Sequence, residues 1–285
     1  MPSPKITDPQ SLVANSVRLS SLPEIFLKLN EVIKDPKSSF SEIGAVISKD
    51  TSLSARLLKI VNSGFYSFPS KVETIVHAIS IVGLQQLRDL AFATTIIFTF
   101  KDISEELVSM NSFWKHNIAV GIAARNIAIY RREVNVERFY LIGILHDIGR
   151  LILFENMPKL ARDAIDQTNS SNDLLFKKER EVIGFDHAAV GGVLLHEWKF
   201  PDSLEEVVTY HHDPSYAKRY PVETAIVHFA DVMVHAMELG KSGENCVPPL
   251  DPKAWDLMGI PVSAIGLIMG QVEKQYTTVL DNVFG

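Results

Sequence analysis

The chain has 285 residues, of which 46% are hydrophobic and 22% charged, as is ordinary for a globular protein that buries a large core. Its net charge is −6, and the excess of acid lies after residue 100, because residues 1–100 carry 10 Lys and Arg against 8 Asp and Glu. An acidic chain is a poor partner for the phosphate backbone of a nucleic acid, so this class of function is disfavoured and a cation site is favoured.

The compartment and the membrane relation are predicted from three features. The single cysteine, Cys246, excludes a disulfide framework within the chain and favours a reducing cytoplasm. The first residues, Met-Pro-Ser-Pro-Lys, lack the apolar segment of a signal peptide. The longest apolar stretch, residues 90–100, is too short to cross a membrane and contains three threonines. We therefore expect no transmembrane segment and no membrane partner.

Apolar residues at helical spacing dominate the first hundred residues. After a polar lead-in with a short helix, we expect a helix that starts at Ser20–Pro23 and stops at Asp35, and further helices over residues 41–48, 50–63, 74–82 and 84–100. Asp50 is the expected N-cap of the helix over residues 50–63. The segment 50–82 resembles a helix-turn-helix, but its exposed face carries few of the basic side chains that read bases, so we interpret it as ordinary packing.

A polar joint at residues 101–110 precedes a second helical region. Here the pattern predicts a helix capped by Asp186 and helices over 111–131, 136–154, 158–167, 174–183, 201–212, 221–237 and 262–279. The sequence therefore predicts an all-α protein in three parts: an N-terminal helical subdomain (1–105), a helical domain (106–240) and a C-terminal extension that packs on it (241–285).

The stretch from residue 144 to 153 is an apolar run that is broken by two metal-competent side chains, His146 and Asp147. An unpaired carboxylate in an apolar interior costs on the order of several kcal/mol, so the pair requires a metal, a cation or a ring of hydrogen bonds. Gly149 allows a second helix to approach closely. Arg150 places a fixed positive charge one turn from His146.

Further candidate ligands lie on other predicted helices. Asp231 is the hardest to explain otherwise, because a lone aspartate in an apolar helix is rare. The histidines have structural alternatives: His116 as a half-exposed residue, and His211 and His212 as partners of a helix C-terminus. Imidazole and carboxylate together suit Mn, Fe, Zn or Ni. The candidate set is His116, His146, Asp147, His187, His211, His212 and Asp231.

The remaining histidines are given lesser roles. His228 lies three residues before Asp231 and could support a ligand or replace one. We interpret the other three as structural residues: His77, His196 and His235.

The order of these residues resembles a known arrangement. His116, then His146-Asp147, then Asp231 is similar to the H…HD…D pattern of the HD superfamily of metal-dependent phosphohydrolases. The added His187 and His211-His212 resemble the HD-GYP branch, which hydrolyses cyclic dinucleotides. Over residues 18–240 the chain looks most like HDOD, the HD-related output domain of bacterial signalling. The motifs that carry this resemblance are Leu22-Pro23 and residues 57–63, 145–150, 185–191, 198–201 and 211–214.

The resemblance implies an HD-like helical bundle with an additional N-terminal subdomain. It implies one or two divalent ions (Fe, Mn, Zn or Ni), one held by His116, His146, Asp147 and Asp231, and the other by His187, His211 and His212. Asp147 would bridge the two ions. The chain departs from the HD-GYP pattern in lacking a Gly-Tyr-Pro segment after His212, and it has Arg150 where the pattern often has lysine.

Two functions follow as hypotheses. In the first, the chain is a signalling output module that binds a protein partner or a nucleotide ligand. In the second, it is a metal-dependent phosphohydrolase that acts on nucleotide or cyclic-dinucleotide phosphoesters, in which Asp147 and Arg150 are catalytic. Binding of DNA is a distant third.

Overall fold

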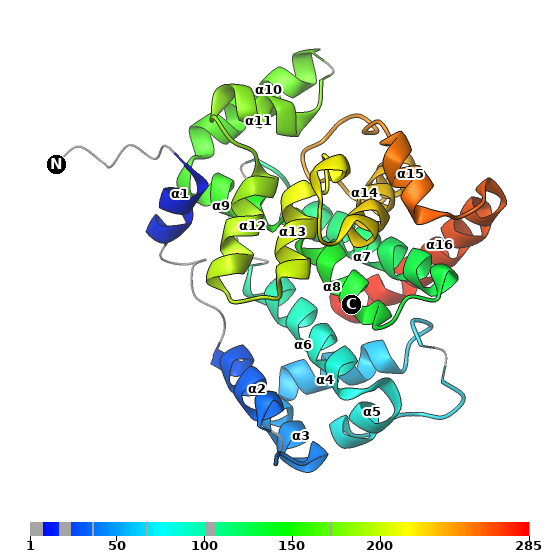
Figure 1. The fold of residues 1–285 in the computed structure, drawn as a ribbon. Helices are drawn as coiled ribbons and strands as arrows, with labels where there is room; N and C mark the ends of the chain where they lie inside the picture. The colour runs from blue at the N-terminus through cyan, green and yellow to red at the C-terminus, as the bar shows by residue number, and fades with distance from the viewer. Residues whose placement is uncertain are drawn as a thin grey trace.

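The computed structural model of the chain describes residues 8–16, 24–35, 37–66, 68–100, 107–171 and 173–284. Within these ranges every regular element is a helix and no strand occurs, which confirms the all-α prediction (Figure 1). The predicted helix start at Ser20–Pro23, the Leu22-Pro23 motif and residues 101–106 of the predicted joint lie outside the described residues.

The N-terminal helices form a unit of their own at the lower edge of Figure 1, in which α3 packs against α2, α4 and α5. Asp50 caps α4 as predicted, since its carboxylate accepts a hydrogen bond from the backbone N–H of Leu53 at 2.9 Å. The helix α6 joins this unit to the rest by packing on α8, whereas α1 lies against α9 and α12. The bounds are α1 (Pro9–Asn15), α2 (Glu24–Lys34), α3 (Phe40–Ser48), α4 (Thr51–Val61), α5 (Ile75–Val82) and α6 (Leu84–Thr99).

The remaining helices surround α7, which is buried along almost its whole length and packs against α8, α14 and α16. Its alanine and isoleucine side chains are distributed around the whole helix, as expected for a central helix. The bounds are α7 (Met110–Arg131), α8 (Val136–Leu145), α9 (Ile148–Asn156), α10 (Pro158–Ser171), α11 (Leu175–Val182), α12 (His187–Glu197), α13 (Asp202–Tyr210), the 3₁₀ turn η1 (Pro214–Tyr216), α14 (Pro221–Ala236), α15 (Pro252–Met258) and α16 (Val262–Phe284).

The prediction of one helix over residues 136–154 is wrong, because the chain breaks into α8 and α9 at His146-Asp147. Asp147 has φ −97° and ψ 8°, outside the helical region. The ring Nδ1 of His146 lies 2.6 Å from the carbonyl oxygen of Gly143, which this break leaves free of its usual helical partner. On a continuous helix two consecutive side chains point about 100° apart. The break lets both turn toward the same interior site.

The apolar interior is continuous across the predicted domains. A single cluster of buried side chains extends from Leu12 on α1 through α4 and α7 to Val279 on α16. The boundaries near residues 105 and 240 remain predictions. Among the described helices, none is by itself long and apolar enough to cross a membrane; α15 and residues 262–281 of α16 reach that length and composition only when counted together, across an 84° bend.

The cap of α4 gives a test of the local energetics. We expect Asp50→Ala to lower the free energy of unfolding by about 1 kcal/mol, because the N–H of Leu53 loses its acceptor. Urea denaturation would measure the loss. Glu31→Ala, on an exposed position of α2, is the control and should stay within about 0.5 kcal/mol of the parent. Equal effects of the two substitutions would contradict a capping role.

Candidate metal centre

Five helical elements supply the candidate ligands, and the structure brings all of them into one buried site. His116 comes from α7, His146 and Asp147 from the α8–α9 break, and His187 from the first residue of α12. His211 and His212 follow α13, and Asp231 lies on α14. All except His212, which is half-buried, are at most 3% exposed. Because these side chains are buried and come from separate helices, the site is an internal junction of helices.

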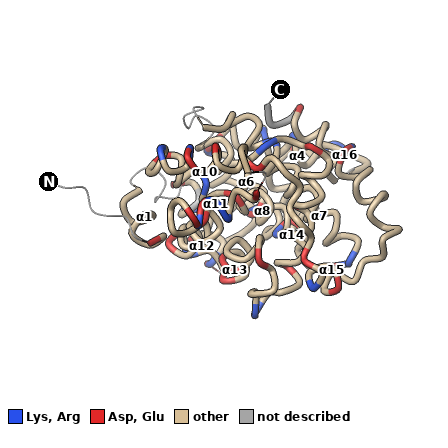
Figure 2. The backbone as a smooth tube through the Cα atoms, turned by 90° about the horizontal axis from the view of Figure 1, so that it is seen from above, with Lys and Arg blue, Asp and Glu red and all other residues tan. Residues whose placement is uncertain are grey.

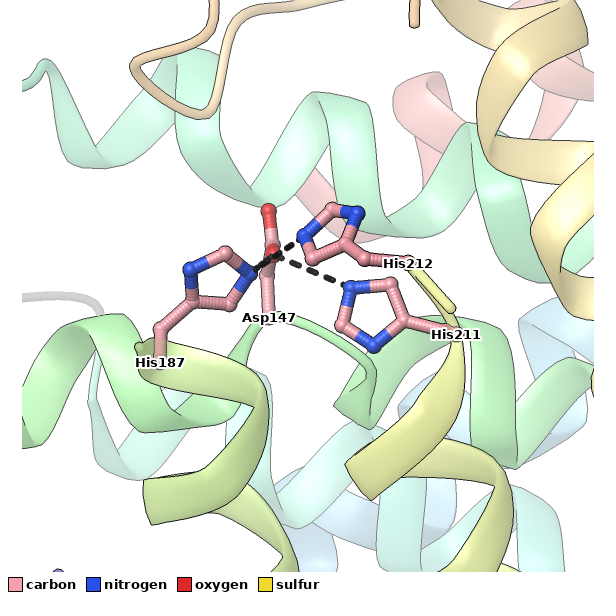
Figure 3. A group of neighbouring side chains, drawn as sticks. All are labelled: Asp147, His187, His211 and His212. Carbon is pink, nitrogen blue, oxygen red and sulfur yellow. Dashed lines mark hydrogen bonds and ion pairs between the residues drawn. The ribbon is translucent and has the colours of Figure 1, made fainter. Parts of the chain in front are cut away.

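One half of the site, which we call the Asp147 cluster, consists of Asp147, His187, His211 and His212, whose side chains point toward one another in Figure 3. Nε2 of His187 lies 2.9 Å from Asp147 Oδ1 and 2.9 Å from Nε2 of His212. Nε2 of His211 lies 3.9 Å from the same carboxylate oxygen. One ligand atom from each of the four residues lies within 4.8 Å of the others, a spacing that a single ion can span.

The other half, the Asp231 cluster, consists of His116, Asp231 and His235. Oδ1 of Asp231 lies 3.1 Å from Nε2 of His116 and 3.3 Å from Nε2 of His235. Nε2 of His146 lies 3.6 Å from Asp231 Oδ1 and 3.6 Å from Asp147 Oδ2, between the two carboxylates. Asp147 also groups with His116 and His146. Its carboxylate therefore faces both halves of the site.

His235 is the residue that sequence reasoning left outside the site. It was interpreted as structural, yet it lies against Asp231 and its ring centroid is 4.6 Å from that of His116. The available signal was its position four residues after Asp231, which places both side chains on one face of α14. Glu179, which bonds His187, gave no such signal because it lies on a different helix.

Hydrogen bonds of Nδ1, to a backbone carbonyl or to a carboxylate, fix the orientation of three histidine rings. Nδ1 of His211 lies 2.7 Å from the carbonyl oxygen of Val208, and Nδ1 of His187 lies 2.6 Å from a carboxylate oxygen of Glu179. With His146 held in the same way by Gly143, each ring presents Nε2 to the site. His228 differs: its Nδ1 lies 2.8 Å from the carbonyl oxygen of His211 and its Nε2 accepts from Asp251, so it supports the neighbouring ligand from outside.

Several atoms in the interior have no hydrogen-bond partner among the described residues. In the site these include Nε2 of His146 and Nε2 of His211, while the carboxylate of Asp147 is contacted by ion pairs with His187 and Arg150. A buried polar atom that is left unsatisfied costs about 1–3 kcal/mol. Several such atoms directed at one point fit a bound cation, and imidazole nitrogens with carboxylate oxygens are the donors that Mn, Fe, Zn and Ni accept. The residues present therefore fit a divalent metal.

The pKa values of His116, His211 and Asp147 suit the same ion, whereas His187 must lose a proton to bind it. Burial lowers the pKa of His116 to about 4 and that of His211 to about 3, so both rings are neutral at pH 7, as a metal ligand must be. Burial would raise the pKa of Asp147, but the charge of Arg150 and the adjacent histidines hold that pKa well below its usual value. Burial and Arg150 lower the pKa of His187, but Glu179 and Asp147 outweigh them and raise it to about 9.

Arg150 lies beside the Asp147 cluster and is 1% exposed. Its Nε is 3.1 Å from Asp147 Oδ1, and its Nη1 donates to the carbonyl oxygen of Ser242 at 2.6 Å. Ser242 belongs to the loop after α14, and Glu244 of that loop accepts a hydrogen bond from the backbone N–H of Leu175 at 2.7 Å. The loop therefore covers the guanidinium group and closes this side of the site.

The chain is similar in sequence to one protein family and to a curated protein. The profile of the HDOD domain matches residues 19–214. An uncharacterized protein of Treponema pallidum (strain Nichols) is 22% identical over 222 residues, which are 77% of this chain and only 43% of that protein. This chain thus spans less than half the length of that curated relative.

Two solved structures share the architecture. An HDOD domain protein of unknown function from Geobacter sulfurreducens superposes with a TM-score of 0.75 at 23% identity, covering 93% of this chain and 97% of the other. A candidate phosphohydrolase from Shewanella amazonensis SB2B gives a TM-score of 0.74 at 23% identity, covering 96% and 98%. At this identity the likeness establishes the fold, and the helical bundle with an additional N-terminal unit is common to all three chains.

Proposed function

The chain belongs to the HDOD family, and we propose that it is a signal-transduction output module in which a divalent metal centre ties the helices together without turning over a substrate. The ion or ions would be held by His116, His146, Asp147, His187, His211, His212 and Asp231, with His235 as an additional donor. Such an ion stabilises the folded state because the unfolded chain does not hold these ligands together. The module would act in the cytoplasm on a protein partner supplied by another chain.

The observation that carries this proposal is the enclosure of the site. Both Asp147 and Arg150 are 1% exposed. The guanidinium group of Arg150 already contacts the carboxylate of Asp147 and the carbonyl oxygen of Ser242. A phosphoester must reach the ions and a free cationic group to be hydrolysed. The described residues supply the ions with ligands, and the buried, already paired Arg150 favours the binding of an ion over the hydrolysis of a phosphoester.

The second candidate is a metal-dependent phosphohydrolase, and one specific observation favours it. Asp147 faces both ligand groups, as the bridging carboxylate of a two-ion site does. Two bound metal ions would lower the pKa of a shared water molecule, which could then attack phosphorus. The loop around Ser242 would have to move to admit the substrate.

Metal analysis combined with turnover separates the two candidates. Protein purified without a histidine tag or chelators is analysed for metal, loaded with Mn or Fe, and assayed with bis(p-nitrophenyl) phosphate and a cyclic dinucleotide. We expect about one to two equivalents of metal and no turnover above that of Asp147→Ala. Turnover that rises with metal content and disappears in Asp147→Ala would establish the hydrolase instead. Absence of metal after loading would contradict both candidates.

A further inference from the structure

A pocket separate from the metal centre lies where the N-terminal unit meets the rest of the fold. It is bounded by α2, α6, α8 and the turn between α12 and α13, and its volume is about 240 Å³. The turn carries the Trp198-Lys-Phe-Pro201 motif, which contributes nothing to the metal ligands. The side chains of this motif line the pocket instead.

The lining of the pocket is cationic in a chain of net charge −6. It contains Lys34, Arg88, Arg138 and Lys199 against a single acid, Asp89. Arg88 is paired with Asp89 at 2.7 Å, and Arg138 lies 3.3 Å from Glu223, which is outside the lining. Neither lysine forms an ion pair with any residue that the structure describes. Two positive charges therefore converge on the pocket without an acidic partner, whereas along the chain as a whole basic and acidic residues are interspersed (Figure 2).

The pocket is also lined by aromatic side chains. Phe92, Trp198 and Phe200 line it, with centroid distances of 5.1 Å between Phe92 and Phe200 and 6.2 Å between Trp198 and Phe200. The indole N–H of Trp198, which is 4% exposed, has no acceptor among the described residues, and neither does Nε of Arg138.

The backbone at Lys199 sets the direction in which the chain leaves α12. Lys199 has φ +57°, the left-handed conformation that L-residues other than Asn and Asp seldom adopt. Here it ends α12 in a common helix C-terminal motif, in which the backbone N–H of Phe200 donates to the carbonyl oxygen of Leu195 at 3.0 Å. Here the conformation sits between the two aromatic side chains and places a lysine at the edge of the pocket.

We propose that this pocket binds a small molecule that has one flat ring system and an anionic group, the chemistry shared by nucleoside monophosphates and aromatic carboxylates. The ring would pack against Trp198 and Phe200, and the anion would meet Lys34 and Lys199. The volume of about 240 Å³ is just below the range of about 300–1,000 Å³ typical of ligand pockets, so a ligand with two nucleobases is not enclosed.

The pocket and the metal centre lie at opposite ends of the same three helices. Arg138 is near the start of α8, and His146 follows its end. Trp198 follows the end of α12, whereas His187 begins that helix. Leu204 is near the start of α13, and His211 follows its end. At about 1.5 Å per residue, the 11 residues of α12 separate the two sites by about 16 Å. The proposed ligand therefore does not compete with the metal, and its binding does not depend on the function proposed above.

Calorimetric titration of the full chain tests this site with adenosine 5′-monophosphate, benzoate and inorganic phosphate as probes. We expect at least one of the two aromatic anions to bind with a dissociation constant below about 1 mM, and inorganic phosphate to bind at least about tenfold more weakly. The two aromatic probes distinguish a nucleotide source from a carboxylate source. Failure of both aromatic probes to bind, or equal binding of inorganic phosphate, would overturn the proposal.

Variants then locate the binding. Lys34→Gln combined with Lys199→Asn, in which asparagine tolerates the left-handed backbone, should weaken the bound probe by at least about tenfold. The matched control is Lys253→Gln with Lys274→Gln, two exposed lysines on α15 and α16. Trp198→Phe should remove the change in tryptophan fluorescence on binding. Unchanged affinity in the lysine variant, or equal losses in variant and control, would place the ligand elsewhere.

Discussion

Alanine at Gly149 is expected to destabilise the protein by about 3 kcal/mol or more and to remove metal from the Asp147 cluster. A Cβ at this position would lie 2.0 Å from the carbonyl oxygen of His187 and 2.6 Å from the backbone nitrogen of Gly191. Both are backbone atoms of α12, so no change of rotamer relieves the overlap. The helix α9 must move away from α12 as a whole. Because His187 begins α12 and Asp147 precedes α9, that movement separates two candidate ligands that now lie 2.9 Å apart.

The control for this substitution is Gly266→Ala on α16, where a Cβ would meet no atom within 4 Å. There the loss of backbone freedom in the unfolded chain should stabilise the protein by about 0.5–1 kcal/mol. Urea denaturation and metal analysis of the two variants give the comparison. A Gly149→Ala protein that matched its parent in both measurements would show that α9 and α12 do not pack as closely as described.

The close approach at Gly149 also shows how far sequence alone can go. The small residue Gly149 predicted that a second helix approaches closely, and the contact between α9 and α12 confirms this. The cap at Asp50 was likewise readable, because capping depends on residues three positions apart. Features governed by neighbours along the chain were predictable.

Features governed by tertiary packing were not. The break between α8 and α9 has no proline or glycine at its centre, so the apolar run concealed it. The spacing of four residues places His235 on the same face of α14 as Asp231, but its contact with His116 depends on how α14 packs against α7. The resemblance to HD proteins supplied the order of the ligands, but only the packing of α7, α12 and α14 shows that their side chains meet.

Asp231→Asn is expected to reduce the stabilisation that metal gives to the fold. One oxygen of Asp231 lies near three imidazoles, those of His116, His146 and His235. An amide keeps the shape but loses the charge, so the ion of the Asp231 cluster should bind about 10–100-fold more weakly. At a metal concentration about 1,000 times the parent dissociation constant, the ion stabilises the parent by about 4 kcal/mol, and the variant should lose roughly 1.4–2.8 kcal/mol of this.

Thermal unfolding with and without chelator isolates this effect from the cost of the substitution itself. In the presence of chelator, the Tm values of parent and variant differ only by the cost of replacing the Asp231 carboxylate, which contacts three imidazole rings. With metal, the increment in Tm should shrink in Asp231→Asn by about 2–4 °C for each kcal/mol lost. The exposed Asp163→Asn on α10 should retain the full increment. An equal increment in all three proteins would mean that the stabilising ion is bound outside the Asp231 cluster. Because Asp147 faces both clusters, Asp147→Asn should then reveal whether the other half holds the ion alone.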